Sequence, residues 1–137
     1  MSGNGERKIL VVDNDADILV ELERILEDGG YSTTTALNSA DAHELLSRGN
    51  FDLLVLDDYL SDSDSVQVLA EYRGSGIDVL TVVTYHRFPS CDDEKRLRAL
   101  GASALVNKQA HTELIEIVNY LLSPRVARYH DGFGHMT

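Results

Sequence analysis

The sequence predicts an α/β fold in which a five-stranded parallel sheet lies between two layers of helices. Strand-like and helix-like segments alternate five times along the 137 residues, and this alternation requires right-handed crossovers that place helices on both faces of a sheet. The segment Asp52–Asp57 is a continuous apolar run between its acidic ends, as expected for a strand that is covered on both faces.

The first two strands and the helix between them follow from local patterns. A strand over roughly Lys8–Asp13 leads into a helix from about Asp15 to Asp28, with apolar residues at helical spacing. Gly29 and Gly30 end this helix, because glycine adopts the left-handed conformation of a C-cap at little cost. The β-branched run over residues 31–35 predicts the second strand.

The middle of the chain contains two further helices around the third strand. Ser39 is expected to cap a helix that Gly49 and Asn50 close. The third strand spans Asp52–Asp57 and is followed by a polar turn. A short helix then ends at residues 74–76, and its expected inward residues are Val66, Leu69 and Ala70.

The remaining strands and helices complete the alternation. The fourth strand is expected at Asp78–Thr84 and the fifth at Ser103–Val106, with a charged helix over about Asp92 to Leu100 between them. The last helix spans about Thr112 to Leu122. Five strands and five helices within one chain of this size fit the flavodoxin-like, doubly wound, three-layer fold with strand order 2-1-3-4-5.

Domain organisation is expected to be simple. Residues 1–122 form one domain, and residues 123–137 form a short, mobile tail. This tail is too short for a DNA-binding or enzymatic output domain, so the chain either acts alone through protein partners or was cut from a larger protein.

Composition excludes several classes of function. The net charge is −11, with 23 acidic residues against 12 Lys and Arg, and an acidic surface repels nucleic-acid backbones. The apolar runs are far shorter than the ~20 residues that cross a bilayer, and the polar N-terminus does not resemble a signal peptide. We therefore expect a cytoplasmic protein that binds neither nucleic acid nor membrane. Its single cysteine, Cys91, cannot form an internal disulfide.

Four polar residues stand at the ends of four apolar strands: Asp13, Asp57, Thr84 and Lys108. In a parallel sheet these strand ends meet at one edge, where ligands bind. Two carboxylates about 4 Å apart repel by roughly 4 kcal/mol at an effective dielectric of about 20, so the pair calls for a cation. Oxygen ligands suit Mg²⁺, and one carboxylate is then placed to accept a phosphoryl group as an acyl phosphate. Lys108 and Thr84 would contact the phosphoryl oxygens.

This arrangement resembles the receiver domain of two-component response regulators over residues 7–122. The acidic pair of the family falls on Asp13 and Asn14, and its phosphorylated aspartate falls on Asp57. The Thr/Ser and lysine of the family fall on Thr84 and Lys108. The resemblance implies a phosphoacceptor in a phosphorelay, a signalling module that catalyses only its own phosphoryl transfer and dephosphorylation.

The resemblance also implies a cofactor, partners and a switch. Mg²⁺ would be bound by Asp13, Asn14, Asp57 and the backbone carbonyl of Tyr59. The phosphoryl group would come from a sensor histidine kinase, a phosphotransfer protein or a small donor. Phosphorylation would draw Thr84 inward and change a surface made by the fourth helix, fifth strand and fifth helix. That surface would bind a downstream protein, a fused output domain or a second copy of the chain.

The sequence departs from the family pattern at the metal site. The second residue of the acidic pair is Asn14, which removes one negative charge and lowers the expected affinity for Mg²⁺, and Asp15 is a candidate for partial compensation. Four further departures lie nearby: a turn over residues 59–65 without Pro or Gly, the large Tyr85 where a small residue is expected to leave access, Leu105 at the aromatic switch position, and Gln109 where a cis proline is usual.

Two alternatives remain open at this point. The chain is a receiver-like docking module that works without phosphorylation, or it is a phosphatase similar to haloacid dehalogenases that uses Asp13 and Asp15 as nucleophile and acid/base. The phosphatase would need another acidic metal ligand after Lys108, where only Gln109, Ala110 and His111 follow. It would also need a cap insertion where a helix begins.

Overall fold

The computed structural model describes residues 6–123 and confirms the predicted α/β fold. Five parallel strands form one sheet in the order β2-β1-β3-β6-β7. In chain order this is the predicted order 2-1-3-4-5 of the five long strands. Their bounds are Lys8–Val12 for β1, Ser32–Ala36 for β2, Leu53–Asp57 for β3, Leu80–Tyr85 for β6 and Ala102–Asn107 for β7.

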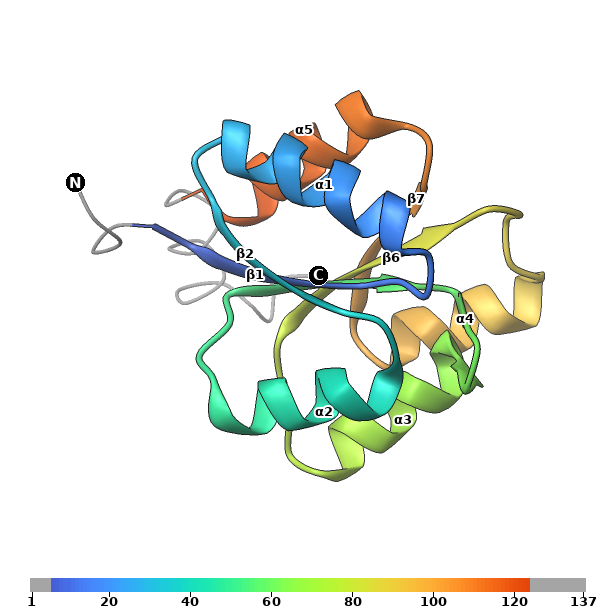
Figure 1. The fold of residues 1–137 in the computed structure, drawn as a ribbon. Helices are drawn as coiled ribbons and strands as arrows, with labels where there is room; N and C mark the ends of the chain where they lie inside the picture. The colour runs from blue at the N-terminus through green and yellow to red at the C-terminus, as the bar shows by residue number, and fades with distance from the viewer. Residues whose placement is uncertain (1–5, 124–137) are drawn as a thin grey trace.

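Helices cover both faces of the sheet, as Figure 1 shows. On one face lie α1 (Ala16–Asp28) and α5 (His111–Leu121), and on the other lie α2 (Ser39–Arg48), α3 (Ser65–Gly74) and α4 (Cys91–Ala99). The crossover through α1 therefore lies on one face and the crossovers through α2, α3 and α4 lie on the other. Because all five strands are parallel, their C-termini meet at one edge of the sheet.

The core consists of two apolar clusters, one on each face of the sheet. Successive residues of β1 point to opposite faces, so Ile9 and Val11 pack with α1 and α5, while Leu10 and Val12 pack with α2, α3 and α4. All five residues of β3 are buried. This burial on both faces explains the continuous apolar run that predicted a central strand.

Three local predictions were wrong. Asn38, not Ser39, caps α2, because the Asn38 side chain accepts a hydrogen bond from the Asp41 backbone N–H. In α3 the residue Ala70 is exposed, and Val68 packs inward in its place. The polar turn after Asp57 contains a small antiparallel hairpin, β4 (Tyr59–Leu60) and β5 (Ser63–Asp64).

The structure does not test the predicted domain boundary or the predicted tail. The domain boundary at residue 122 stays a prediction, and residues 124–137 of the expected tail lie outside the described part of the chain. Within residues 6–123, no helix has the length and apolar character that a membrane span requires.

Arg73 joins three elements near the amino-terminal end of β6. Its guanidinium donates hydrogen bonds to the backbone carbonyl of Leu100, just after α4, and to the carbonyls of Ile77 and Val79. It also donates to the Thr81 hydroxyl in β6. A half-buried cation thus satisfies four oxygen atoms that no apolar side chain could satisfy.

Replacing Arg73 with Met should therefore destabilise the fold. Arg73→Met keeps much of the apolar stem but leaves these acceptors without their donor, and we expect a loss of about 2–4 kcal/mol in the free energy of unfolding. Urea denaturation followed by circular dichroism measures this loss. The exposed Arg48 is the matched control, and Arg48→Ala should change stability by less than about 0.5 kcal/mol. Equal urea midpoints for the two variants would contradict the role of Arg73.

Candidate functional site

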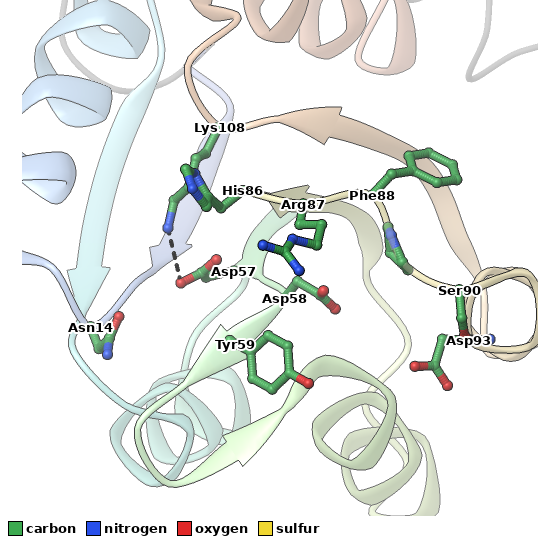
Figure 2. A pocket seen from close by; sticks show the side chains of 11 residues that line it. Asn14, Asp57, Asp58, Tyr59, His86, Arg87, Phe88, Ser90, Asp93 and Lys108 are labelled. Atoms are coloured by element: carbon green, nitrogen blue, oxygen red, sulfur yellow. Dashed lines mark hydrogen bonds and ion pairs between the residues drawn. The ribbon is translucent and has the colours of Figure 1, made fainter.

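The structure brings the four polar strand-end residues together at the carboxyl edge of the sheet. Asp57 is the last residue of β3 and lies opposite Thr84 of β6 in the strand register. Asp13 follows β1 and Lys108 follows β7. The ammonium Nζ of Lys108 lies 3.1 Å from Oδ2 of Asp13 and 3.2 Å from Oδ2 of Asp57. Figure 2 shows the Lys108–Asp57 contact at the pocket.

Backbone hydrogen bonds between neighbouring strand ends hold these residues in place. The N–H of Asp13 donates to the carbonyl of Ala36, and the N–H of Asp58 donates to the carbonyl of Thr84. The N–H of Lys108 donates to the carbonyl of Tyr85. Each residue is thereby fixed by the strand beside it, so the site is built on the sheet itself rather than on a free loop.

Burial and charge together set the protonation of the site. Asp13 and Asp57 are 1% and 4% exposed. Burial and the nearby carboxylate of Asp13 raise the pKa of Asp57 to about 6, although Lys108 and the backbone N–H of Tyr59 act in the opposite direction. Burial also disfavours the charge on Lys108, but the two carboxylates outweigh it, so the pKa of Lys108 is raised. At neutral pH the Asp57 carboxyl is therefore mostly ionised, and Lys108 carries its positive charge.

Asp13 retains an oxygen whose bonding capacity is not filled. Its Oδ1 accepts a hydrogen bond from the Asp15 backbone N–H. Within residues 6–123 its Oδ2 is the only buried side-chain nitrogen or oxygen whose polar contact is an ion pair alone, the one with Lys108 Nζ at 3.1 Å. A buried carboxylate oxygen of this kind, close to a second carboxylate, fits an oxygen-binding cation such as Mg²⁺.

Of the other predicted metal ligands, two lie at the pocket and one does not. Asn14 and Tyr59 line the pocket beside Asp57. Asp15 instead caps α1, because its Oδ1 accepts from the backbone N–H groups of Asp17 and Ile18. In the described part of the chain no three acidic, His or Cys side chains group as a metal site. Any cation here would have two carboxylates and would need neutral oxygens to complete its coordination.

A pocket of about 620 Å³ opens over Asp57. Sequence reasoning assigned no role to several of the residues that line it, and Figure 2 shows their side chains around the opening. One is Asp58, directly after Asp57, and the others come from the segment after β6 and the first turn of α4: Arg87, Phe88, Pro89, Ser90 and Asp93. Their proximity to Thr84 and Asp57 in sequence was the available signal.

The departures from the family pattern have distinct structural outcomes. Tyr85 was expected to screen the phosphoryl site, but it does not line the pocket. Its ring packs edge-on against that of Phe88, with ring centroids 5.1 Å apart, and Phe88 lines the pocket instead. Leu105 is half-buried against the cluster beneath α2, α3 and α4. Residues 6–123 contain no cis peptide bond, so the bond between Lys108 and Gln109 is trans, as glutamine predicts.

The segment after Asp57 is fixed by two carboxylates rather than by Pro or Gly. Asp58 accepts a hydrogen bond of 2.5 Å from the Ser65 hydroxyl at the start of α3. Asp62 accepts from the hydroxyl and the backbone N–H of Ser39 at the start of α2. Leu60 is buried between these anchors. The hairpin is therefore tied to two helices.

Comparison with known proteins identifies relatives of one kind. A family model described as the response regulator receiver domain matches residues 9–119. The transcriptional regulatory protein PrrA of Mycobacterium leprae is 32% identical over 126 residues, which cover 92% of this chain and 54% of PrrA. The alginate biosynthesis transcriptional regulatory protein AlgB of Pseudomonas putida is 41% identical over 70 residues, covering 51% of this chain and 16% of AlgB. The chain thus spans about half the length of PrrA and a smaller part of AlgB.

Solved structures show the same fold. A CheY-like response regulator receiver domain protein from Methanospirillum hungatei superposes with a TM-score of 0.78 at 22% identity, covering 85% of this chain and 93% of that one. Response regulator protein TrrA from Thermotoga maritima, solved in complex with Mg²⁺-BeF, has a TM-score of 0.73 at 29% identity. That comparison covers 85% of this chain and 99% of TrrA.

The raised pKa of Asp57 predicts a pH-dependent effect of removing its charge. An ordinary aspartate has a pKa of 3.8, so the folded chain binds an extra proton between about pH 4 and 6, and stability falls as the pH rises through this range. Asp57→Asn removes that cost and should raise the free energy of unfolding by about 1–3 kcal/mol at pH 8 and by much less at pH 4.

Urea denaturation in metal-free buffer with a chelator measures this effect at both pH values. The exposed Glu44 provides the control, because Glu44→Gln should give the same small change at pH 4 and pH 8. A stability change for Asp57→Asn that is independent of pH would refute the raised pKa.

Proposed function

The chain belongs to the response regulator receiver domain family, and from this premise we propose that it accepts a phosphoryl group on Asp57. The observation that carries the proposal is the buried Asp57 carboxylate at the pocket, with Lys108 Nζ at 3.2 Å and Thr84 opposite in the neighbouring strand. This geometry supports nucleophilic attack by a carboxylate whose surroundings neutralise incoming negative charge.

The chemistry assigns one role to each side chain. A carboxylate oxygen of Asp57 forms the new bond to phosphorus while the bond from phosphorus to the donor breaks, and the donor leaves with that electron pair. The product is an acyl phosphate. Because the pKa of Asp57 is about 6, its carboxylate is mostly ionised and nucleophilic at neutral pH. Lys108 would pair with the phosphoryl oxygens, and the Thr84 hydroxyl would donate a hydrogen bond to them.

The donor set supports a Mg²⁺ site at the same place. Asp13, with its unfilled Oδ2, and Asp57 would supply the charged ligands, and Asn14 and the backbone carbonyl of Tyr59 would supply neutral oxygens. When bound, the ion supplies positive charge that offsets the charge of the phosphoryl group. The relative TrrA was solved with Mg²⁺-BeF, which supports this assignment. Asn14 makes the site weaker than one with a third carboxylate.

Partners follow from the same proposal. A sensor histidine kinase or a phosphotransfer protein would donate the phosphoryl group in the cytoplasm. The output would be a change in the surface formed by α4, β7 and α5. Leu105 lies in β7, and Thr84 lies in the neighbouring strand β6. This surface would bind a protein target, an output domain or a second copy of the chain. PrrA and AlgB, both named as transcriptional regulators, are longer than the matched region, which supports a fused output domain.

A second candidate function is docking without phosphorylation. Asn14 in the metal site, Leu105 at the switch position and the trans bond before Gln109 favour it, because each alters the ordinary switching apparatus. The phosphatase alternative has no comparable support, since Asp15 caps α1 and helix α1 begins directly after it.

Phosphoryl transfer should be visible as a mass increase of the intact chain. Treatment with acetyl phosphate and Mg²⁺ should give one phosphoryl adduct on the wild type and none on Asp57→Asn, because the nucleophilic oxygen is lost. Asp13→Asn should reduce the rate without relocating the adduct. A wild type that stays unlabelled at high Mg²⁺ with rapid quenching would favour the docking module. Sustained phosphatase turnover that requires Asp13 but not Asp57 would favour the phosphatase.

Restoring the missing acid should tighten the metal site. Asn14→Asp adds a charge beside a divalent ion, worth about 2 kcal/mol at 4 Å even in water, so the Mg²⁺ dissociation constant should fall at least tenfold. Isothermal titration of the unphosphorylated chain with MgCl₂ measures it. Asn50→Asp adds the same charge at an exposed position outside the pocket and serves as the control. Equal affinities for the two variants would argue against Asn14 as a ligand.

A further inference from the structure

Arg87 is a cation in the pocket that the proposed chemistry has not used. It lies in the segment between β6 and α4, and Figure 2 shows its side chain reaching over the pocket beside Asp57 and Asp58. Within residues 6–123 its guanidinium forms no ion pair with a carboxylate. An arginine that is exposed and uncommitted remains available to an anion that enters the pocket.

The segment that carries Arg87 is anchored on both sides. Before it, Tyr85 is the last residue of β6, and its carbonyl accepts the backbone N–H of Lys108. After it, the Phe88 ring packs edge-on against Tyr85, with ring centroids 5.1 Å apart. Ser90 then caps α4 by accepting the backbone N–H of Asp93. Arg87 is thus held at the pocket by its neighbours while its own side chain stays free.

The charges that line the pocket leave a role for a second cation. Asp57, Asp58 and Asp93 are acidic, whereas Lys108 and Arg87 are the lining cations. Lys108 already contacts two carboxylates, at 3.1 and 3.2 Å. An incoming phosphoryl group adds further negative charge, and a guanidinium binds phosphoryl oxygens through two parallel N–H donors.

We propose that Arg87 is a second ligand of the phosphoryl group, donating from its guanidinium to phosphoryl oxygens as the group is transferred to Asp57. This inference rests on the proposed phosphoacceptor function. In the unphosphorylated chain the ion-pair partner of Asp57 is Lys108 and not Arg87, so the Arg87 contact forms with the phosphoryl group and not with the free carboxylate. The opposing interpretation is an arginine that is merely hydrated or screened by Asp58.

The rate of adduct formation tests the proposal. Wild type, Arg87→Ala, Arg87→Lys and Arg48→Ala are treated with subsaturating acetyl phosphate and Mg²⁺, and the adduct is followed by intact mass. We expect the initial rate to fall about tenfold in Arg87→Ala, the size expected for loss of one charged hydrogen-bonded contact. Arg87→Lys should recover part of the rate. Arg48→Ala removes the same charge from an exposed site on α2 and should match the wild type.

Beryllofluoride binding with Mg²⁺ gives a second measurement that needs no phosphoryl transfer. Its dissociation constant should rise by a similar factor in Arg87→Ala, while the urea midpoint stays unchanged. Rates and affinities of Arg87→Ala equal to those of Arg48→Ala would overturn the role of Arg87 and leave the phosphoacceptor function standing. A wild type that neither forms the adduct nor binds beryllofluoride would overturn both.

Discussion

The ion-pair triad of Lys108 with Asp13 and Asp57 is the interaction on which the site depends. Two nearly buried carboxylates cannot share a sheet edge without a compensating charge, and the ammonium lies within 3.2 Å of both. It joins the ends of β1, β3 and β7, three strands that lie far apart in sequence. The same triad leaves one Asp13 oxygen available to a cation and holds the Asp57 carboxylate, whose pKa of about 6 keeps it mostly ionised at neutral pH, where a phosphoryl group would reach it.

The sheet makes this concentration of charge possible. Its central strand β3 is covered on both faces, so apolar burial stabilises the backbone that presents Asp57 at the strand end. Arg73 performs a related task at the opposite, amino-terminal end of β6, where it ties α3 and the end of α4 to the strand. Rigid support from both ends of the sheet allows a costly, desolvated set of charges to persist.

Much of the fold and the central site could be predicted from sequence, because the relevant signals are local and repeated. Apolar runs identified four of the five long strands and a β-branched run identified the second, while helical spacing identified the five helices. The strand ends identified Asp13, Asp57, Thr84 and Lys108. Ser39 was misassigned as a cap since its hydroxyl bonds to Asp62, a partner 23 positions away. Arg87 and Phe88 were missed although they closely follow Thr84, because they lie in a loop that has no periodic pattern to show which side chains line the pocket. Residue type in a loop does not reveal such contacts.

The hairpin after Asp57 limits which segments can be exchanged between this chain and other receiver domains. In this chain Asp58 and Asp62 connect the hairpin to Ser65 and Ser39, the first residues of α3 and α2. A proline- and glycine-containing turn taken from another receiver would supply a similar backbone path but would not supply these carboxylates. The hydroxyls of Ser39 and Ser65 would then be buried donors without a hydrogen-bond acceptor, which costs stability. A chimera between two receivers must therefore exchange this turn together with α2 and α3, because the turn and the two helices depend on the same hydrogen bonds.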